Sequence, residues 1–500
     1  MRINLKDKKT YTTALVLIIL LSFILRVIKL DTLNLWRDEA FSVILAQKNI
    51  HEFFYIALKD TSSFLHNFLL FIWVRLFGIN EFSVRFLSLI ASMFSFRYFY
   101  LIIKRFFKFK WQYIALLLIS SVNMISIYFA REARVYSILI FLILASQYYF
   151  LKLIEKFNIK TIILFIIFTT LSLYSHNLTI FIIISQILYL FIIFLKNSYK
   201  LEVKQIFKKR NKFFLNWFLI YTILFILISP YLLLFLAQNK NVSEEFWLTF
   251  SPIDSLKETL TGLSVGIRLF THKEFTFLDS FTNILTLSLA FIGTYFNIRN
   301  FKRTKLFFSF FFWIPLTLIF LASFKTPVFY VRYASFLIPF MIVLVFEGIV
   351  NLTKSKLIQT ILIIILIILN LRIYYIYIKD NSTKAHHKEL VTYIANNFNS
   401  NDGIIHINAL SYFPFKYYTK GKLISTIYDP EYNTPYYIGT ALTRENEYTR
   451  DFSTLERFDR LWVIELGNND SREFLNNNFI IIEDKWFDGY LYLQLWENIY

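Results

Sequence analysis

Residues 358–378, IQTILIIILIILNLRIYYIYI, form a long apolar stretch with one charged residue, Arg372. A helix of about 20 apolar residues crosses the ~30 Å hydrocarbon core of a bilayer, and it satisfies its own backbone hydrogen bonds, which lipid cannot do. Similar runs recur upstream, near 11–30, 81–103, 111–129, 136–151, 160–175, 177–195, 213–236, 277–297, 306–324 and 332–350. The sequence therefore predicts a polytopic α-helical membrane protein with about eleven transmembrane helices.

The composition agrees with this class. The chain has 500 residues, of which 56% are hydrophobic and only 17% are charged, less than a soluble protein of this length needs for its surface. It has no cysteine, which excludes disulfides and thiolate metal sites. The basic stretch and apolar run of residues 1–30 resemble a signal peptide, but no small-residue cleavage site follows, so we interpret them as a retained first helix.

The net charge of +19 is unevenly distributed. Residues 1–378 carry 41 Lys/Arg and 17 Asp/Glu, whereas residues 379–500 carry 12 and 17. The positive charge lies in short loops between apolar runs, which is typical of a topology signal and argues against nucleic-acid binding. Placing these loops in the cytoplasm predicts a plasma-membrane protein with its N-terminus inside and its C-terminus outside. The basic clusters lie at 2–9, 104–110, 152–160, 196–212, 299–305 and 354–356.

This topology sends the remaining loops to the outer face, at 31–80, 129–135, 175–177, 237–276 and 325–331. Within the first of them, residues 66–77 are apolar but too short to span the membrane. We therefore expect an interfacial or re-entrant helix there.

The composition changes near Lys379, which predicts two domains: a transmembrane domain at 1–378, including the outer-face loop 31–80, and a small extracytoplasmic α/β domain at 379–500. In the second domain, helical and strand patterns alternate around an Asn-Asp-Gly turn signal at 401–403. Helices are expected at 386–398, 413–418 and 471–477, and strands at 404–407, 423–427, 461–465 and 478–482.

Two outer loops carry clustered charges. Asp38 and Glu39 lie side by side in Leu35–Phe41, although Asp38 could simply cap a helix that starts at Glu39. Residues 131–136, Arg-Glu-Ala-Arg-Val-Tyr, could equally be a solvated helix end with a local ion pair. Further polar residues stand beside outer membrane ends, where a lone histidine is more often structural than catalytic: His66, His176, Lys325, Arg332 and Tyr333.

The predicted topology places all these residues on one face of the membrane. Ionisable residues at the membrane are costly, which favours a functional role. Arginine and lysine suit a lipid phosphate, and a carboxylate can accept the proton of a hydroxyl nucleophile.

The chain resembles the polyprenyl-phosphate-sugar-dependent glycosyltransferases of the GT-C fold, specifically the protein O-mannosyltransferase and aminoarabinose transferase family (glycosyltransferase family 39). The resemblance covers roughly residues 10–350 and lies in the order and spacing of motifs. One departure is His66-Asn67-Phe68, where the family usually has His-Pro-Pro, so the local turn should differ. The matching motifs are Asp38-Glu39, His66, 78–85 (GINEFSVR), 132–137 (EARVYS), 174–177 (YSHN), Arg332-Tyr333 with Pro339, and the tail motif Tyr417-Tyr418.

The resemblance implies an inverting transfer from a sugar on a polyprenyl or dolichyl phosphate, presented from the outer leaflet. Asp38 would be the general base, or would orient the acceptor, and Glu132 would be a second acidic residue that lines the cavity and belongs to the catalytic site. Neither a cofactor nor a metal is expected to be essential. The lipid phosphate, sugar and acceptor would be bound by Glu39, His66, Arg85, Arg131, Arg134, Tyr136, His176, Lys325, Arg332 and Tyr333.

Two other function classes stay open. A lipid flippase or transporter would also place charges in a membrane cavity, but near mid-membrane and often beside Gly or Pro breaks. A non-enzymatic scaffold would use the outer α/β domain to bind a partner, which leaves the clusters at Asp38 and Glu132 unexplained. The sequence does not distinguish protein hydroxyls, lipid A and other envelope glycans as acceptors, nor does it identify the sugar.

Overall fold

The computed structural model describes residues 7–198, 203–242, 247–266, 275–299, 306–380, 384–432, 434–467 and 478–499. Its described residues fall into two compact units. One is a helical bundle of Met1–Ile28, Arg85–Leu236 and Leu248–Ile376, and the other combines Lys29–Val84, Ala237–Trp247 and Tyr377–Tyr500. The loop 31–80, which the sequence predicts at the outer face, thus belongs to the same unit as the C-terminal region, and each unit is described by itself below.

The bundle unit confirms a polytopic helical protein. Among the described residues, eight helices are long and apolar enough to span a membrane, or nine if the bent pair α6 (Lys110–Val122) and α7 (Met124–Ala130) is counted as one span. The two other predicted spans are the 17-residue helices α9 (Ile159–Ser175) and α14 (Leu306–Ala322). The eight are α1 (Lys8–Val27), α5 (Glu81–Phe106), α8 (Tyr136–Glu155), η1 with α10 (Asn177–Phe194), the 213–232 part of α11 (Val203–Val242), α13 (Phe277–Arg299), η3 with α15 (Ser335–Leu352) and α16 (Lys356–Lys379).

Helix α15 (Ile338–Leu352) lies at the centre of the bundle. In its most apolar stretch of 18 residues 83% are buried, compared with 17% in the corresponding stretch of α11. Helix α15 packs closely on α13 because glycines face each other. A Cβ added at Gly293 would lie 2.0 Å from the carbonyl oxygen of Leu344, and one at Gly348 would lie 2.0 Å from that of Leu289. Small residues of this kind let two membrane helices approach at their backbones. The amphipathic helix α12 (Pro252–Ser264) completes the unit.

The second unit begins with three short helices, α2 (Arg37–Ala46), α3 (Ile50–Lys59) and α4 (Phe64–Phe77). As expected, α4 is apolar and, with 14 residues, too short to span. It starts at the N-cap Ser63 and ends at Gly78, whose φ of +80° is the left-handed conformation that favours glycine.

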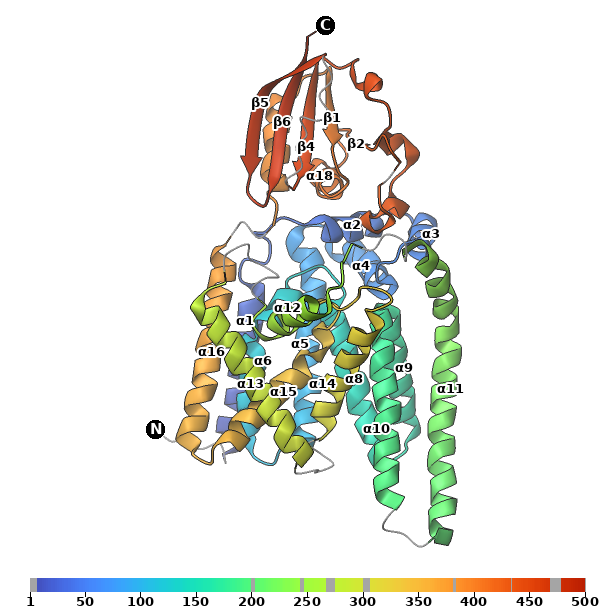
Figure 1. The fold of residues 1–500 in the computed structure, drawn as a ribbon, viewed down its shortest axis with the longest axis vertical. Coiled ribbons are helices and arrows are strands. Elements are labelled where there is room, and N and C mark those ends of the chain that lie inside the picture. The colour runs from blue at the N-terminus through green and yellow to red at the C-terminus, as the bar shows by residue number, and fades with distance from the viewer. Residues whose placement is uncertain are drawn as a thin grey trace. The chain divides into compact units, whose positions relative to one another are not determined.

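The C-terminal region contains a six-stranded sheet in the order β3-β2-β1-β4-β6-β5 (Figure 1). Strands β3, β2, β1 and β4 are parallel, and β6 is antiparallel to both β4 and β5. The strands are β1 (Asp402–His406), β2 (Thr426–Tyr428), β3 (Tyr448–Thr449), β4 (Arg460–Leu466), β5 (Phe479–Phe487) and β6 (Leu491–Asn498), and the α-helices are α17 (His387–Asn397) and α18 (Tyr412–Thr419).

Both faces of this sheet are covered. Trp462 and Ile464 of β4 pack in one core with Leu390 of α17, while Leu461 and Val463 point to the opposite face and join a second core. This alternation is what a strand buried on both faces requires. The small α/β region expected from the sequence is confirmed, whereas the helix expected at 471–477 lies outside the described residues.

Candidate functional site

Asp38 lies in the first turn of α2, so it does not cap the helix from outside. The N-cap is Trp36. The Oδ1 atom of Asp38 accepts hydrogen bonds from Nε and Nη2 of Arg37, at 2.9 and 2.7 Å, and the Asp38 side chain keeps 16% of its exposure. A carboxylate in the first turn is favoured by the helix dipole. The side chain is thus oriented by its neighbour and still accessible.

Glu39 is adjacent to Asp38 but, unlike it, is buried and ion-paired. Its side chain is fully buried, and Oε2 lies 2.6 Å from Nζ of Lys384. The same oxygen accepts a hydrogen bond from the backbone N–H of Trp36 at 3.5 Å. The structure therefore gives Glu39 a contact that fixes the start of α2, and its predicted role in substrate binding stays a prediction.

His66 is buried near the start of α4. Its backbone N–H donates to Oγ of the N-cap Ser63, and its Nδ1 lies 3.4 Å from Oδ1 of Asn67. The backbone N–H of Asn67 donates to the carbonyl oxygen of Ser63, a helical bond that proline cannot make. Because this chain has Asn67 where the family usually has proline, helix α4 keeps its backbone hydrogen bond at this position.

In the bundle unit, Glu132 follows α7 and is fully buried. Within the described residues, neither of its carboxylate oxygens has a hydrogen-bond partner. Arg332 lies within electrostatic range of it. Burial by itself lowers the pKa of the Arg332 guanidinium, but Glu132 and three tyrosines hold that pKa well above its ordinary value: Tyr128, Tyr136 and Tyr330. A fully buried carboxylate thus lies within electrostatic range of a half-buried guanidinium.

Other residues of the loop 131–135 support this cluster. Nη1 of Arg131 donates to the carbonyl oxygens of Arg26 and Ile28, and thereby caps the C-terminal end of α1. The backbone N–H of Arg134 donates to the carbonyl oxygen of Glu132 at 2.8 Å. These contacts fix the loop that carries Glu132.

His176 joins this part of the bundle through its ring, whose centroid lies 5.4 Å from that of Tyr333. Its Nδ1 accepts a hydrogen bond from the backbone N–H of Leu178 at 3.2 Å. Burial and the neighbouring guanidinium of Arg134 lower the pKa of His176 to about 4. The imidazole is therefore neutral at pH 7 and offers no positive charge to a phosphate.

The remaining predicted residues are placed separately. Tyr136 is the first residue of α8 and packs on Phe129, with ring centroids 4.7 Å apart. Arg85 is buried in α5, whereas Lys325 is exposed in the turn after α14. The structure thus brings together Glu132, Arg134, His176, Arg332 and Tyr333 in one unit, while Asp38, Glu39 and His66 belong to the other.

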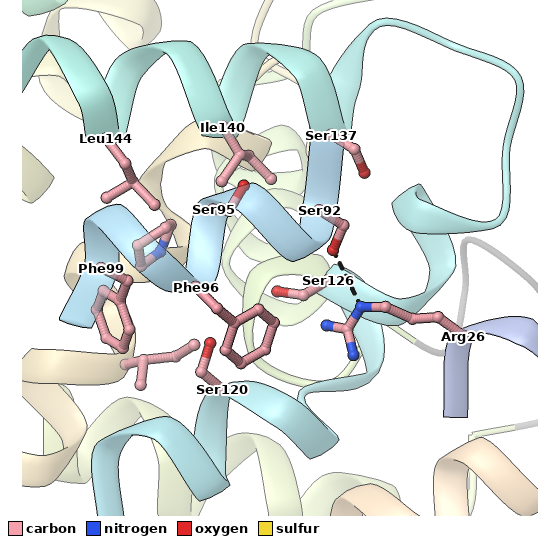
Figure 2. A pocket seen from close by; sticks show the side chains of 12 residues that line it. Arg26, Ser92, Ser95, Phe96, Phe99, Ser120, Ser126, Ser137, Ile140 and Leu144 are labelled. Carbon is pink, nitrogen blue, oxygen red and sulfur yellow. Dashed lines mark hydrogen bonds between the residues drawn. The ribbon is translucent and has the colours of Figure 1, made fainter. Parts of the chain in front are cut away.

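A cavity of about 30 Å³, lined by apolar side chains, serines and one arginine, lies between α5, α6, α7, α8 and α15 (Figure 2). The fully buried Arg26 reaches it from α1. Its Nε donates to Oγ of Ser92, and its Nη1 donates to the carbonyl oxygens of Ser22 and Ser121. The guanidinium therefore joins three helices, and the cavity has room for about one or two waters. The sequence analysis did not single out Arg26, although an arginine inside an apolar run suggests a functional role.

No metal site is evident in the described part of the chain, where no group of three or more His, Asp or Glu side chains could hold an ion. Lys384 is the second residue that sequence reasoning missed. No motif marks this lysine, and its partner Glu39 is 345 positions away.

Comparisons with known proteins agree with this architecture. The family model of dolichyl-phosphate-mannose-protein mannosyltransferases matches residues 61–234. That range contains Glu132 and His176 but neither Asp38 nor Arg332. No curated protein matches the chain by sequence.

Solved structures match over nearly the whole chain. ArnT from Cupriavidus metallidurans in the apo state is 10% identical with a TM-score of 0.63, and the match covers 97% of this chain and 98% of that one. The same protein bound to undecaprenyl phosphate matches over the same shares, with 10% identity and a TM-score of 0.59. The apo oligosaccharyltransferase of Archaeoglobus fulgidus is 12% identical with a TM-score of 0.54, covering 92% of this chain and 70% of that one. The chain therefore has the GT-C fold of these membrane proteins and resembles the protein O-mannosyltransferase and aminoarabinose transferase family.

Proposed function

We propose that this protein is an inverting glycosyltransferase that moves a sugar from a polyprenyl or dolichyl phosphate to an extracytoplasmic acceptor. The observation that carries the proposal is the match of 97% of the chain to ArnT bound to undecaprenyl phosphate. The family model that matches residues 61–234 supports the same donor class, a sugar linked to a lipid phosphate. Protein hydroxyls, lipid A and other envelope glycans are the acceptors to be tested.

The proposed reaction is a single displacement. The acceptor oxygen attacks the anomeric carbon from the face opposite the phosphate, so a new C–O bond forms with inversion. The bond from that carbon to the phosphate oxygen breaks, and the lipid phosphate leaves with the electron pair. Asp38 takes the proton of the acceptor hydroxyl, for which its oriented and accessible carboxylate is suited.

The leaving phosphate needs positive charge. Arg332 is the proposed residue for it, because its guanidinium stays charged where burial strengthens electrostatic interactions. Glu132 holds that guanidinium electrostatically, and Arg134 is fixed beside it through the backbone of Glu132. Lys325 is exposed, and its ammonium group is a second candidate to contact the lipid phosphate.

The topology belongs to the proposal as well. An outer-leaflet donor requires the C-terminal region to be outside the cell and the N-terminus to be in the cytoplasm of a plasma-membrane protein. Lipid flippase or transporter activity is the alternative. Two buried charged groups within the spans lie near helix ends: Arg26 is the second-last residue of α1, and Asp279, which pairs with Arg372 of α16 at 2.6 Å, is in the first turn of α13. Arg97, in contrast, lies in the middle of α5. The placement of Arg26 and Asp279 supports an enzyme that works at one face.

The test uses purified full-length protein in lipid nanodiscs and a panel of undecaprenyl-phosphate hexoses, pentoses and aminosugars. Binding of one donor class, followed by release of undecaprenyl phosphate when a hydroxyl acceptor is added, is the expected result. Failure of every donor to bind, together with movement of undecaprenyl phosphate across proteoliposome membranes, would establish the transporter reading instead.

A further inference from the structure

The segment that carries Asp38 is held by side chains from the C-terminal region of the same unit. Nδ2 of Asn34 donates to Oε2 of Glu389 at 3.0 Å. The backbone N–H of Leu35 donates to the hydroxyl oxygen of Tyr418 at 2.8 Å. The segment is therefore attached at two successive residues just before α2 begins.

The third attachment is the ion pair between Lys384 and Glu39. The Nζ–Oε2 distance is 2.6 Å, and the side chains keep only 6% and 0% of their exposure. A buried ion pair depends on both partners, because removing one leaves the other charge buried and uncompensated. Glu39 also accepts the backbone N–H of Trp36, so the pair fixes the position at which α2 starts.

The backbone of Lys384, Ala385 and His386 packs closely against the turn between β5 and β6. The backbone N–H of His386 donates to the carbonyl oxygen of Asp488 in the β5–β6 turn. At Gly489, with φ of +79°, an added Cβ would lie 2.5 Å from Cα of Ala385 and 2.8 Å from the carbonyl carbon of Lys384. Only glycine permits this approach, so the sheet determines where the Lys384 ammonium can reach.

We propose that Lys384 is a positioning residue for Asp38, acting through Glu39 and the first turn of α2. The inference rests on the proposed function, in which Asp38 is the general base, and it gives the C-terminal region a task in that reaction. Asp38 directly precedes Glu39, so a shift of the Glu39 carboxylate moves the first turn and with it the base. Misplacement of a catalytic group by about 1 Å typically costs on the order of 10²-fold in rate.

The test compares Lys384→Met with Lys384→Arg and with a control, Lys388→Met, in the full-length chain. Lys388 is exposed on α17 of the same region. With the donor identified from the undecaprenyl-phosphate panel, Lys384→Met should lower kcat about 10- to 100-fold while the donor KM changes less than about twofold. Lys384→Arg, which keeps the charge, should retain most of kcat, and Lys388→Met should behave as the unsubstituted protein.

Hydrogen–deuterium exchange of the same proteins supplies a readout that needs no transfer. Lys384→Met should raise exchange in peptides covering Arg37–Ala46 and leave α9 and α10 unchanged. If Lys384→Met fails to fold, the double variant Glu39→Gln with Lys384→Met is measured instead, because it removes both charges together. Since both residues act through one contact, the kcat of the double variant should be no lower than the kcat of Glu39→Gln alone.

Unchanged kcat in Lys384→Met, or lowered kcat with unchanged exchange in α2, would overturn the proposal. So would a Lys384→Arg variant as slow as Lys384→Met. If the unsubstituted protein transfers no sugar from any donor, the proposed function fails, and the exchange experiment alone then decides whether Lys384 holds α2. Raised exchange confined to α2 would support that contact, and unchanged exchange would refute it.

Discussion

Nζ of Lys384 lies 2.6 Å from Oε2 of Glu39, a residue 345 positions earlier in the chain, and both side chains are buried. Through this pair the C-terminal region contacts the residue next to Asp38. The two adjacent carboxylates of one dipeptide therefore lie in different environments: Glu39 is buried in an ion pair, whereas Asp38 keeps an accessible side chain.

The topology can be tested with cysteines, because the native chain has none. Ser400 and Ser355 are both exposed, so a cysteine at either position is accessible to a label from its own side of the membrane. In intact cells, a membrane-impermeant maleimide should label Ser400→Cys and should label Ser355→Cys only after the cells are permeabilised. The opposite pattern would invert the topology and remove the basis for an outer-face site.

Arg332→Ala should weaken donor binding without unfolding the protein. Loss of a hydrogen bond to a charged group costs on the order of 1.5–3 kcal/mol, which corresponds to a rise of about 10- to 150-fold in Kd. Titration of undecaprenyl phosphate followed by tryptophan fluorescence measures this change. Arg299→Ala, at the exposed end of α13, is the matched control. Unchanged affinity in Arg332→Ala would remove Arg332 from the site.

Glu132→Gln tests whether the buried carboxylate serves Arg332. The substitution keeps the shape of the side chain but removes the negative charge that holds the guanidinium. We expect weaker donor binding, in the same direction as in Arg332→Ala, and little added loss in the double variant because the two residues interact. Losses that simply add in free energy would show that the two residues act independently.

The C-terminal region should have a lower free energy of unfolding in acid than at neutral pH. Burial lowers the pKa of both His387 and His406 to about 3, against about 6.5 in an unfolded chain. Between these values the unfolded state binds more protons, so the free energy of unfolding falls as the pH falls below 6.5, by at most about 1.4 kcal/mol per pH unit for each histidine.

Denaturation of the full-length protein at pH 7 and pH 5, followed by local hydrogen–deuterium exchange in β1 and β4, measures this loss. His406→Gln should reduce the pH dependence, since the hydrogen bonds of His406 to Ser411 and Ser425 do not require a charge. His51→Gln, on the exposed face of α3, should leave it unchanged. A stability that is flat from pH 7 to pH 5 would contradict the assignment of buried neutral histidines.

The membrane helices were predictable because each is an apolar run that can be recognised from its own residues. All eleven apolar runs are helices, and the two that are shorter than the others, α9 and α14, still coincide with predicted spans. Within the C-terminal region, α17, α18, β1 and β4 were predicted close to their observed bounds. Strand β6 was missed although Leu491, Leu493 and Leu495 alternate along it; Tyr492 and Trp496 on its other face make the alternation of apolar and polar residues incomplete.

The candidate site was predictable only where its residues are local in sequence. The Arg131–Tyr136 loop and the Asp38-Glu39 pair stand out as charges beside apolar runs. The Lys384–Glu39 pair could not be found in this way, since nothing in a lone lysine indicates a partner so far away along the chain. The neutral state of His176 was equally hidden, because it follows from burial and from Arg134, which only the folded chain brings near.

The central claim is tested most directly by Asp38→Asn. Asparagine keeps the size of the side chain, and its amide oxygen can still accept the hydrogen bonds of Arg37, so expression and donor binding should be unchanged. With a hydroxyl acceptor, the loss of a general base should lower the rate of sugar transfer by about 10²–10⁴. The measurement is the initial rate of transfer from the undecaprenyl-phosphate sugar that the protein binds, compared between Asp38→Asn and the unsubstituted chain. A reduction of about a hundredfold or more at unchanged donor affinity is the predicted result, and a rate close to that of the unsubstituted protein would contradict the account.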